Sequence, residues 1–143
     1  MKKFLAIYLL FVFTTSVANA DNKIPVKLIK IKDGDTVDIK IDKNTFPVRL
    51  IGIDCCETSK IHRAYHQAYD NNLSIEEIVA QGKESMIYLE NLYKSNKDKP
   101  VYIDFKGIDH YGRALGVIYF GKLNVNEDLL KNGGCMIYNY NQN

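Results

Sequence analysis

Short runs of alternating apolar and polar residues, separated by polar turns, most constrain what this chain can fold into. Residues 36–41 alternate with a period of two, as a strand with one buried face does. Residues 26–31 mix apolar residues with lysine before this run, and residues 46–53 form a third run after a polar turn. Three strands that follow one another through short turns predict an antiparallel meander.

The middle of the chain changes from a strand pattern to a helix pattern. Residues 59–72 are polar and rich in His, Tyr and Asn, which is typical of a loop, with or without a helical turn. Ser74 and Glu77 have the spacing of a capping box, in which the two residues exchange hydrogen bonds at a helix start. Apolar residues at helical spacing continue to Tyr93, so we expect this helix to end near residues 94–96.

Strand patterns return at residues 101–105 and 114–120, and a second helical signal follows them. Asn124 at its start and Gly133 at its end frame a helix from 125 to about 132. The order of three strands, a helix, two strands and a helix predicts an α+β fold with a mainly β core. We expect a small five-stranded barrel of the OB-fold type, capped by helices.

The first twenty residues have the composition of an export signal. Lys2 and Lys3 precede an apolar run at 4–13, and residues 18–20 (Ala-Asn-Ala) form a small-x-small cleavage pattern. The run is too short to span a bilayer, and an uncleaved membrane anchor is the alternative. Cleavage would leave residues 21–143 as a single domain without stable membrane association, working in a periplasm or outside the cell.

Charge and cysteine content limit the class of partner. The signal carries two of the 19 Lys and Arg residues and none of the 17 Asp and Glu residues, so the mature chain has 17 of each. A nucleic-acid partner therefore has no support from overall charge and needs a local basic cluster.

Cys55, Cys56 and Cys135 are an odd number in an oxidising compartment. The adjacent Cys55 and Cys56 pair only with strain, and Cys135 can pair with either of them.

Three polar clusters lie next to strand ends. Residues 33–36 read Asp-Gly-Asp-Thr, which suits a hard cation with oxygen ligands but is also a common turn. Arg49 lies inside an apolar strand, where a charge is costly, and Asp54 and Glu57 follow it in a pattern that suits either a polar site or a structural salt bridge. The third cluster, residues 109–113, reads Asp-His-Tyr-Gly-Arg and is by itself an ordinary polar turn.

Together the three clusters resemble the pattern of the staphylococcal nuclease (thermonuclease) family. Asp-Gly-Asp-Thr, Arg-x4-Asp-x2-Glu and Asp-x-Tyr-Gly-Arg occur in the same order in that family. The phrase Asn-Val-Asn-Glu at 124–127 and the Tyr-x-Tyr at 138–140 are similar too. The resemblance covers about residues 28–140. It implies a calcium-dependent nuclease that hydrolyses phosphodiester bonds of DNA and RNA and leaves 3′-phosphate ends.

The resemblance implies a catalytic role for three residues. Arg49 and Arg113 would bind the phosphate and stabilise its pentacovalent transition state, because guanidinium forks match phosphate geometry. Glu57 would act as the general base or position the attacking water.

The resemblance also implies a Ca²⁺ site and a nucleotide pocket. The carboxylates of Asp35 and Asp54 and the backbone carbonyl of Cys55 would bind the ion, with Asp33 just outside the ligand shell. The nucleotide pocket would be lined by Tyr111, Tyr138 and Tyr140. Tyrosines stack on any base, so we expect DNA and RNA to be accepted and single strands to be preferred.

The sequence departs from the family pattern in three places. Cys55 and Cys56 stand where a small residue or Thr and then Pro are usual, and we hypothesise that oxidation here switches activity. The loop at 58–73 is longer than in the best-known member, and its cations and rings either contact nucleic acid or are solvated surface. Family members commonly continue into a C-terminal helix, whereas this sequence stops at Asn143, so we expect that helix to be missing.

A non-catalytic nucleic-acid-binding module of the same fold is the alternative function. Such modules have lost catalytic residues, whereas this sequence has Arg49, Glu57 and Arg113 together with both candidate metal aspartates. The sequence therefore favours the enzyme.

Overall fold

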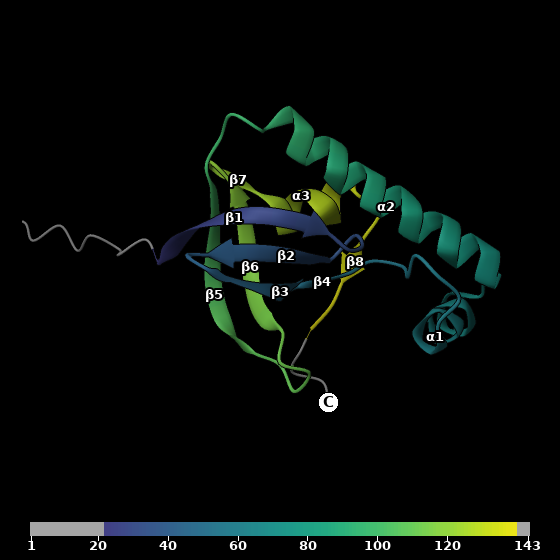
Figure 1. Ribbon diagram of the computed structural model, residues 1–143. Helices are drawn as coiled ribbons and strands as arrows, with labels where there is room; N and C mark the ends of the chain where they lie inside the picture. Colours follow the sequence, from purple (N-terminus) through teal and green to yellow (C-terminus); the bar gives the residue numbers. More distant parts are fainter. Residues whose placement is uncertain (1–21, 140–143) are drawn as a thin grey trace, which may run out of the picture.

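Five strands close into a barrel in the computed structural model, which describes residues 22–139 (Figure 1). They are β1 (Lys23–Ile31), β2 (Thr36–Ile41), β3 (Asn44–Leu50), β5 (Val101–Ile108) and β6 (Ala114–Phe120). Neighbouring strands follow the order β3-β2-β1-β5-β6, and a parallel pairing of β3 with β6 closes the barrel. The expected α+β class and five-stranded barrel are confirmed. The predicted export signal, residues 1–20, and Tyr140 lie outside the described residues.

Three short strands extend this framework. They are β4 (Ile53–Asp54), β7 (Leu123–Asn124) and β8 (Met136–Ile137). The single strand expected at 46–53 is wrong, because β3 ends at Leu50 and Gly52 takes a φ of +79° in the turn before β4. As a result β4 leaves the barrel and pairs with β8, which brings the chain's late segment next to residue 54.

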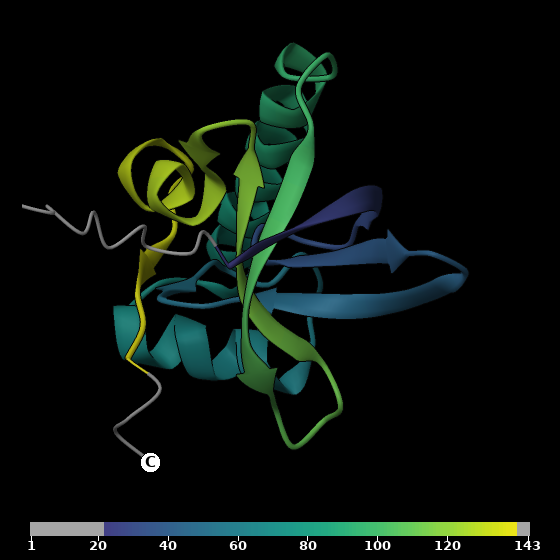
Figure 2. The same ribbon diagram turned by 90° about the vertical axis from the view of Figure 1, so that its left-hand side faces the viewer.

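Two of the three helices follow the expected caps. In α2 (Ile75–Ser95) the Ser74–Glu77 capping box is formed, and in α3 (Val125–Asn132) the Asn124 side chain accepts the Glu127 amide hydrogen. The first of these helices runs diagonally along one side of the barrel and extends beyond it toward α1 (Figure 1). In the turned view the β2–β3 and β5–β6 hairpins project from the barrel in different directions (Figure 2).

The loop expected at 59–72 is instead mostly a helix, α1 (His62–Asn71). Its composition is polar and its N-cap, Ile61, makes no side-chain cap hydrogen bond, so local sequence signals for it are weak. Ala64 is fully buried, however, in a small cluster with Cys56 and Ile78 of α2. Tertiary packing therefore stabilises a helix that the sequence pattern does not indicate.

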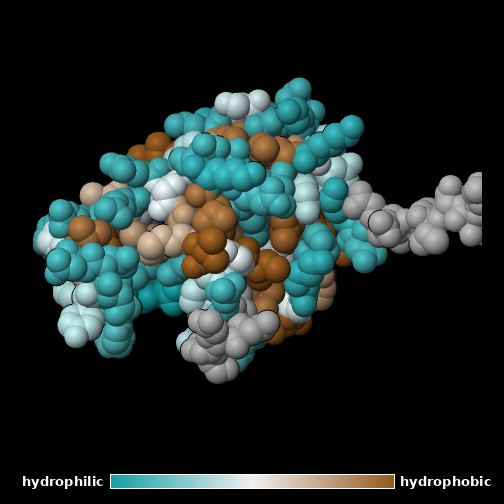
Figure 3. Space-filling view, turned by 180° about the vertical axis from the view of Figure 1, so that it is seen from behind, coloured by the Kyte–Doolittle hydropathy of each residue, from teal (hydrophilic) through white to brown (hydrophobic). Residues whose placement is uncertain are grey.

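The main core lies inside the barrel and under α2 and α3. Inward-facing residues of the strands, such as Ile39, Leu50 and Phe120, pack against Leu89 of α2 and Leu129 of α3. From behind, apolar side chains gather near the centre of the surface, with hydrophilic ones around them (Figure 3). None of the described helices is both long and apolar enough to cross a membrane.

Two glycines set how closely the helix and the loops approach each other. A Cβ at Gly82 of α2 would lie 2.2 Å from the Glu57 carbonyl oxygen, so the helix rests directly on the 56–57 backbone. A Cβ at Gly34, in the β1–β2 turn, would lie 2.9 Å from the Cβ atoms of Cys55 and Ser85. These contacts fix the turn, the 54–57 segment and α2 against one another.

Candidate active site

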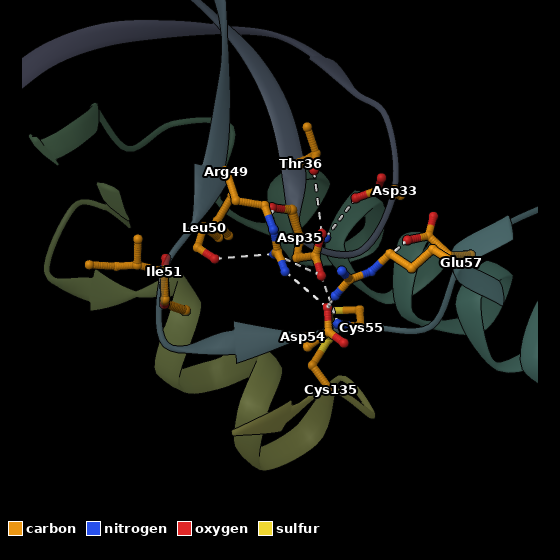
Figure 4. A network of polar contacts seen from close by, with 12 residues as sticks. Asp33, Asp35, Thr36, Arg49, Leu50, Ile51, Asp54, Cys55, Glu57 and Cys135 are labelled. Atoms are coloured by element: carbon orange, nitrogen blue, oxygen red, sulfur yellow. Dashed lines mark hydrogen bonds and ion pairs between the residues drawn. A yellow bond between two sulfur atoms is a disulfide. The ribbon is translucent and has the colours of Figure 1, made fainter. Parts of the chain in front are cut away.

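Arg49, near the end of β3, is the centre of a buried ionic network (Figure 4). Its Nη1 lies 2.8 Å from Asp35 Oδ2, and its Nη2 lies 2.9 Å from Asp54 Oδ1. It also donates to the backbone carbonyls of Asp35 and Leu50. A charge in a strand facing the core is tolerated because two carboxylates and two carbonyls surround it. The network joins two of the polar clusters found in the sequence.

Asp35 is held by the backbone as well as by Arg49. Its Oδ2 accepts the Cys55 amide hydrogen at 2.7 Å, and its Oδ1 lies 3.3 Å from the Thr36 hydroxyl oxygen. Burial raises the pKa of Asp35 to about 7. The Arg49 guanidinium and the Cys55 amide act to lower this pKa, but the effect of burial is larger. Asp33 accepts the Asp35 amide hydrogen at 2.9 Å and so shapes the turn behind this carboxylate.

A disulfide joins Cys55 to Cys135, 80 positions later in the sequence. The sequence left this pairing open. The bond ties the 54–57 segment to the chain just before β8, where the β4–β8 pairing also acts. Cys56 is a buried free thiol whose pKa is raised by burial, and it donates to Gln81 Oε1 at 3.6 Å.

Glu57 lies at the edge of the network and faces the carboxylates (Figure 4). Burial raises the pKa of its carboxyl group, as does nearby Asp33, while Arg63 lowers it. A raised pKa is what a carboxylate needs to accept a proton near neutral pH. The Gly82 contact fixes the backbone of Glu57, although the family's usual proline is replaced by Cys56.

Two side chains of α1 enter the site. The sequence offered Arg63 as a loop cation that either contacts nucleic acid or is solvated, and it gave no signal for Gln67. The Arg63 guanidinium lies 2.5 Å from Asp54 Oδ1 through Nη2 and 3.2 Å from Glu57 Oε1 through Nε. Gln67 accepts the Glu57 amide hydrogen at 2.9 Å and donates to the Cys55 carbonyl at 3.1 Å. The spacing of four residues puts both on one helix face, but only a helix prediction at 62–71 would have shown this.

The third polar cluster forms the tip between β5 and β6. Arg113 Nε lies 2.8 Å from Asp109 Oδ2, and the other oxygen of Asp109 accepts the amide hydrogens of Tyr111 and Arg113. A cleft of about 430 Å³ is lined by Arg113, Tyr111 and Tyr138 together with Arg49 and Arg63. The described residues predicted for phosphate and base binding therefore share one cleft, and Glu57 and Asp33 line its continuation.

The residues predicted to bind Ca²⁺ have donor chemistry that fits it. The carboxylates of Asp35 and Asp54 bind one guanidinium, and the Cys55 amide binds Asp35, so three potential ligand residues lie together. Carboxylate and carbonyl oxygens are the ligands that Ca²⁺ prefers. Within residues 22–139, however, no group of three or more His, Cys, Asp or Glu residues has a metal-holding arrangement. The donors are bonded to Arg49, Arg63 and Gln67 instead.

Comparison with known proteins places these residues in a family context. Residues 47–143 match the family described as staphylococcal nuclease homologue. The chain is 31% identical to an uncharacterized endonuclease of Haemophilus influenzae over 96% of its own length. It is 31% identical to the thermonuclease of Staphylococcus hyicus and to an uncharacterized protein of Methanocaldococcus jannaschii, each over 78% of its length. It spans 65%, 58% and 58% of these relatives, less than two thirds of each.

Proposed function

The chain belongs to the family of staphylococcal nuclease homologues, and we propose that it is a calcium-dependent nuclease that hydrolyses phosphodiester bonds. The observation that carries the proposal is the arrangement around one cleft. Arg49 and Arg113 line the cleft, and Glu57 lines its continuation beside both arginines. Two relatives are named as an endonuclease and a thermonuclease, which supports the same class of reaction.

The two arginines would bind the phosphate that is cut. A phosphodiester repels nucleophiles with its own negative charge, so positive groups around its oxygens lower the barrier. Arg49 is fixed by Asp35 and Asp54 in the barrel wall, and Arg113 is fixed by Asp109 at the hairpin. Two preorganised guanidinium groups that line one cleft suit the binding of a phosphate.

Glu57 would take the proton of the attacking water. Its raised pKa suits a general base, and its side chain borders the cleft beside Asp33 and Thr36. The helix contact at Gly82 and the hydrogen bond from its amide to Gln67 fix its backbone. Such fixing keeps a base within reach of the substrate without reorganisation during the reaction.

Asp35, Asp54 and the Cys55 carbonyl would hold the Ca²⁺ ion, with Asp33 behind Asp35. The ion would supply positive charge beside the phosphoryl oxygens, in addition to that of the arginines. The two carboxylates and the backbone carbonyl are oxygen donors, which supports Ca²⁺ over softer metals.

DNA and RNA are the proposed substrates, with single strands preferred and 3′-phosphate ends as products. Tyr111 is exposed and lines the same cleft as Tyr138, which supports stacking of unpaired bases on tyrosine rings there. The chain would act after export, in a periplasm or outside the cell. The disulfide between Cys55 and Cys135 supports an oxidising compartment.

A cleavage assay tests the proposal. Purified protein is incubated with single-stranded DNA or RNA in Ca²⁺ and in EGTA, beside a Glu57→Gln variant. We expect calcium-dependent cleavage that falls by about 10²-fold or more in the variant, the usual size of a general-base contribution. An Asp98→Asn variant, altered at a residue outside the cleft, controls for charge. Absence of cleavage by the folded protein under both conditions would reject the enzyme and favour the non-catalytic binding module.

A further inference from the structure

Arg63 pairs with carboxylates of the candidate active site. It has no role in the proposed cleavage chemistry or phosphate binding. Its guanidinium bridges Asp54 and Glu57, at 2.5 Å and 3.2 Å, and so joins the candidate metal ligand to the candidate base. Asp54 Oδ1 is shared between Arg63 and Arg49. An oxygen that accepts from two guanidinium groups has little capacity left for a metal ion.

Local helix energetics do not favour a cation at this position. Arg63 is in the first turn of α1, where the partial positive charge of the helix N-terminus disfavours cations. That turn carries no acidic residue, and Ile61 provides no side-chain cap. The ion pairs with Asp54 and Glu57 therefore offset an unfavourable local placement, and both partners belong to the site.

The charge balance of the cluster shows what Arg63 changes. Four carboxylates and two guanidinium groups form the cluster: Asp33, Asp35, Asp54, Glu57, Arg49 and Arg63. They leave a formal excess of two negative charges, which would become three without Arg63. A divalent cation is attracted more strongly as this excess grows.

Arg49 and Arg63 differ in their freedom to leave the carboxylates. The Arg49 side chain is 6% exposed and hydrogen-bonds two backbone carbonyls, so it is part of the barrel wall. The Arg63 side chain is 47% exposed, and among residues 22–139 its guanidinium contacts the two carboxylates of Asp54 and Glu57. A long side chain at the edge of the cleft can turn to solvent without uncovering a buried partner on its own helix.

We propose that Arg63 is a resident counter-cation that competes with Ca²⁺ for Asp54. Before the metal binds, Arg63 holds Asp54 and Glu57 together and limits the repulsion between them. When the metal binds, Arg63 releases Asp54 and turns toward the cleft. The proposal rests on the calcium site of the proposed function, but it concerns metal affinity and not cleavage.

Calcium titration calorimetry on the purified protein tests this competition. We expect Arg63→Gln to lower the Kd for Ca²⁺ by about tenfold, as removal of one unit charge close to a divalent ion should. Arg63→Lys keeps the charge and should return the Kd toward the wild-type value. Lys60→Gln is the matched control, because Lys60 pairs with Glu76 outside the cluster and its loss should leave the Kd unchanged.

A merely structural role for Arg63 predicts the opposite direction. If the arginine only docked α1, its loss would loosen the ligands and weaken Ca²⁺ binding. A second readout is thermal unfolding, where Ca²⁺ should raise the Tm of Arg63→Gln more than that of the wild type at equal concentration.

The proposal is overturned by a Kd that is equal or higher in Arg63→Gln, or by absence of Ca²⁺ binding in both folded proteins. These results are distinct from failure of the nuclease proposal. Tighter binding without cleavage would reject only the nuclease, and cleavage without tighter binding would reject only the competition.

Discussion

Arg49 and Arg113 face the same cleft, but the Arg49 side chain is 6% exposed and that of Arg113 is 31% exposed. Arg49 binds two carboxylates from two other segments of the chain. Arg113 pairs with Asp109 and lies 5.5 Å from the Tyr111 ring centroid, and both of these residues belong to its own hairpin. One wall of the cleft is thus built into the barrel by long-range contacts, and the other is a local turn.

The largest expected difference between the two walls is in stability. Arg49→Ala leaves the buried Asp35 without its cation and Asp54 with Arg63 alone, so we expect a loss of about 3–5 kcal/mol in the free energy of unfolding. Arg113→Ala removes a partly exposed pair and should cost less than about 1 kcal/mol. Urea denaturation measures both, and cleavage should fall in both variants. Equal losses of stability would mean that the two walls are held alike.

The same contrast explains what the sequence could predict. The hairpin cluster is contiguous, so its residues could be found together, and the capping residues Ser74 and Asn124 marked two helices correctly. Asp35, Arg49 and Asp54 are separated along the chain, and only the family resemblance grouped them. The fold class followed from alternation and turns, because those signals are local.

Contacts that depend on tertiary packing escaped sequence reasoning. The helix α1 has a polar sequence without a cap, so Arg63 and Gln67 could not be placed on one face. Asn126 is another example, because this buried residue donates to the carbonyls of Ile51 and Gly116 and holds the turn before β4. Its side chain looks like any helix-surface asparagine in the sequence. The disulfide between Cys55 and Cys135 likewise could not be predicted without knowing that β4 pairs with β8.

A smaller but still substantial effect is expected from breaking the disulfide. Cys135→Ser should cost about 2–4 kcal/mol, the usual range for a native disulfide. The loss of stability should be local to the segment around Cys55 and Asp35, because Cys55 donates its amide hydrogen to Asp35. Hydrogen exchange should speed up at residues 54–57 and stay unchanged at 109–113.

Two controls separate the disulfide from the thiol beside it. Cys56→Ser keeps the Cys55–Cys135 bond and should leave exchange at 54–57 nearly unchanged. Reduction of the wild type should reproduce the Cys135→Ser exchange pattern and lower the turnover rate. Unchanged turnover after reduction would reject the hypothesis that oxidation at these cysteines switches activity.

The most graded effect is expected from pH, because the two walls have carboxylates with opposite pKa shifts. Burial raises the pKa of Asp35 to about 7. Burial also acts to raise that of Asp109, but the hydrogen bonds and charge of Arg113 lower it overall. In the unfolded chain both titrate near pH 3.9. The Asp35 contribution therefore favours the folded state below about pH 4 and is lost as pH rises to about 7, whereas the Asp109 contribution is present above pH 4 and lost in acid.

Urea denaturation in EDTA between pH 5 and 7 isolates the Asp35 side of this comparison. We expect metal-free stability to fall with rising pH by at most about 1.4 kcal/mol per unit, the linkage limit for one proton. Asp35→Asn should flatten this slope, and Asp109→Asn should leave it unchanged. A slope that persists in Asp35→Asn would contradict the assignment. Because the carboxylate must be ionised to bind a cation, Ca²⁺ affinity should rise over the same pH interval. Ionisation of Asp35 should therefore lower the stability of the metal-free protein and strengthen Ca²⁺ binding.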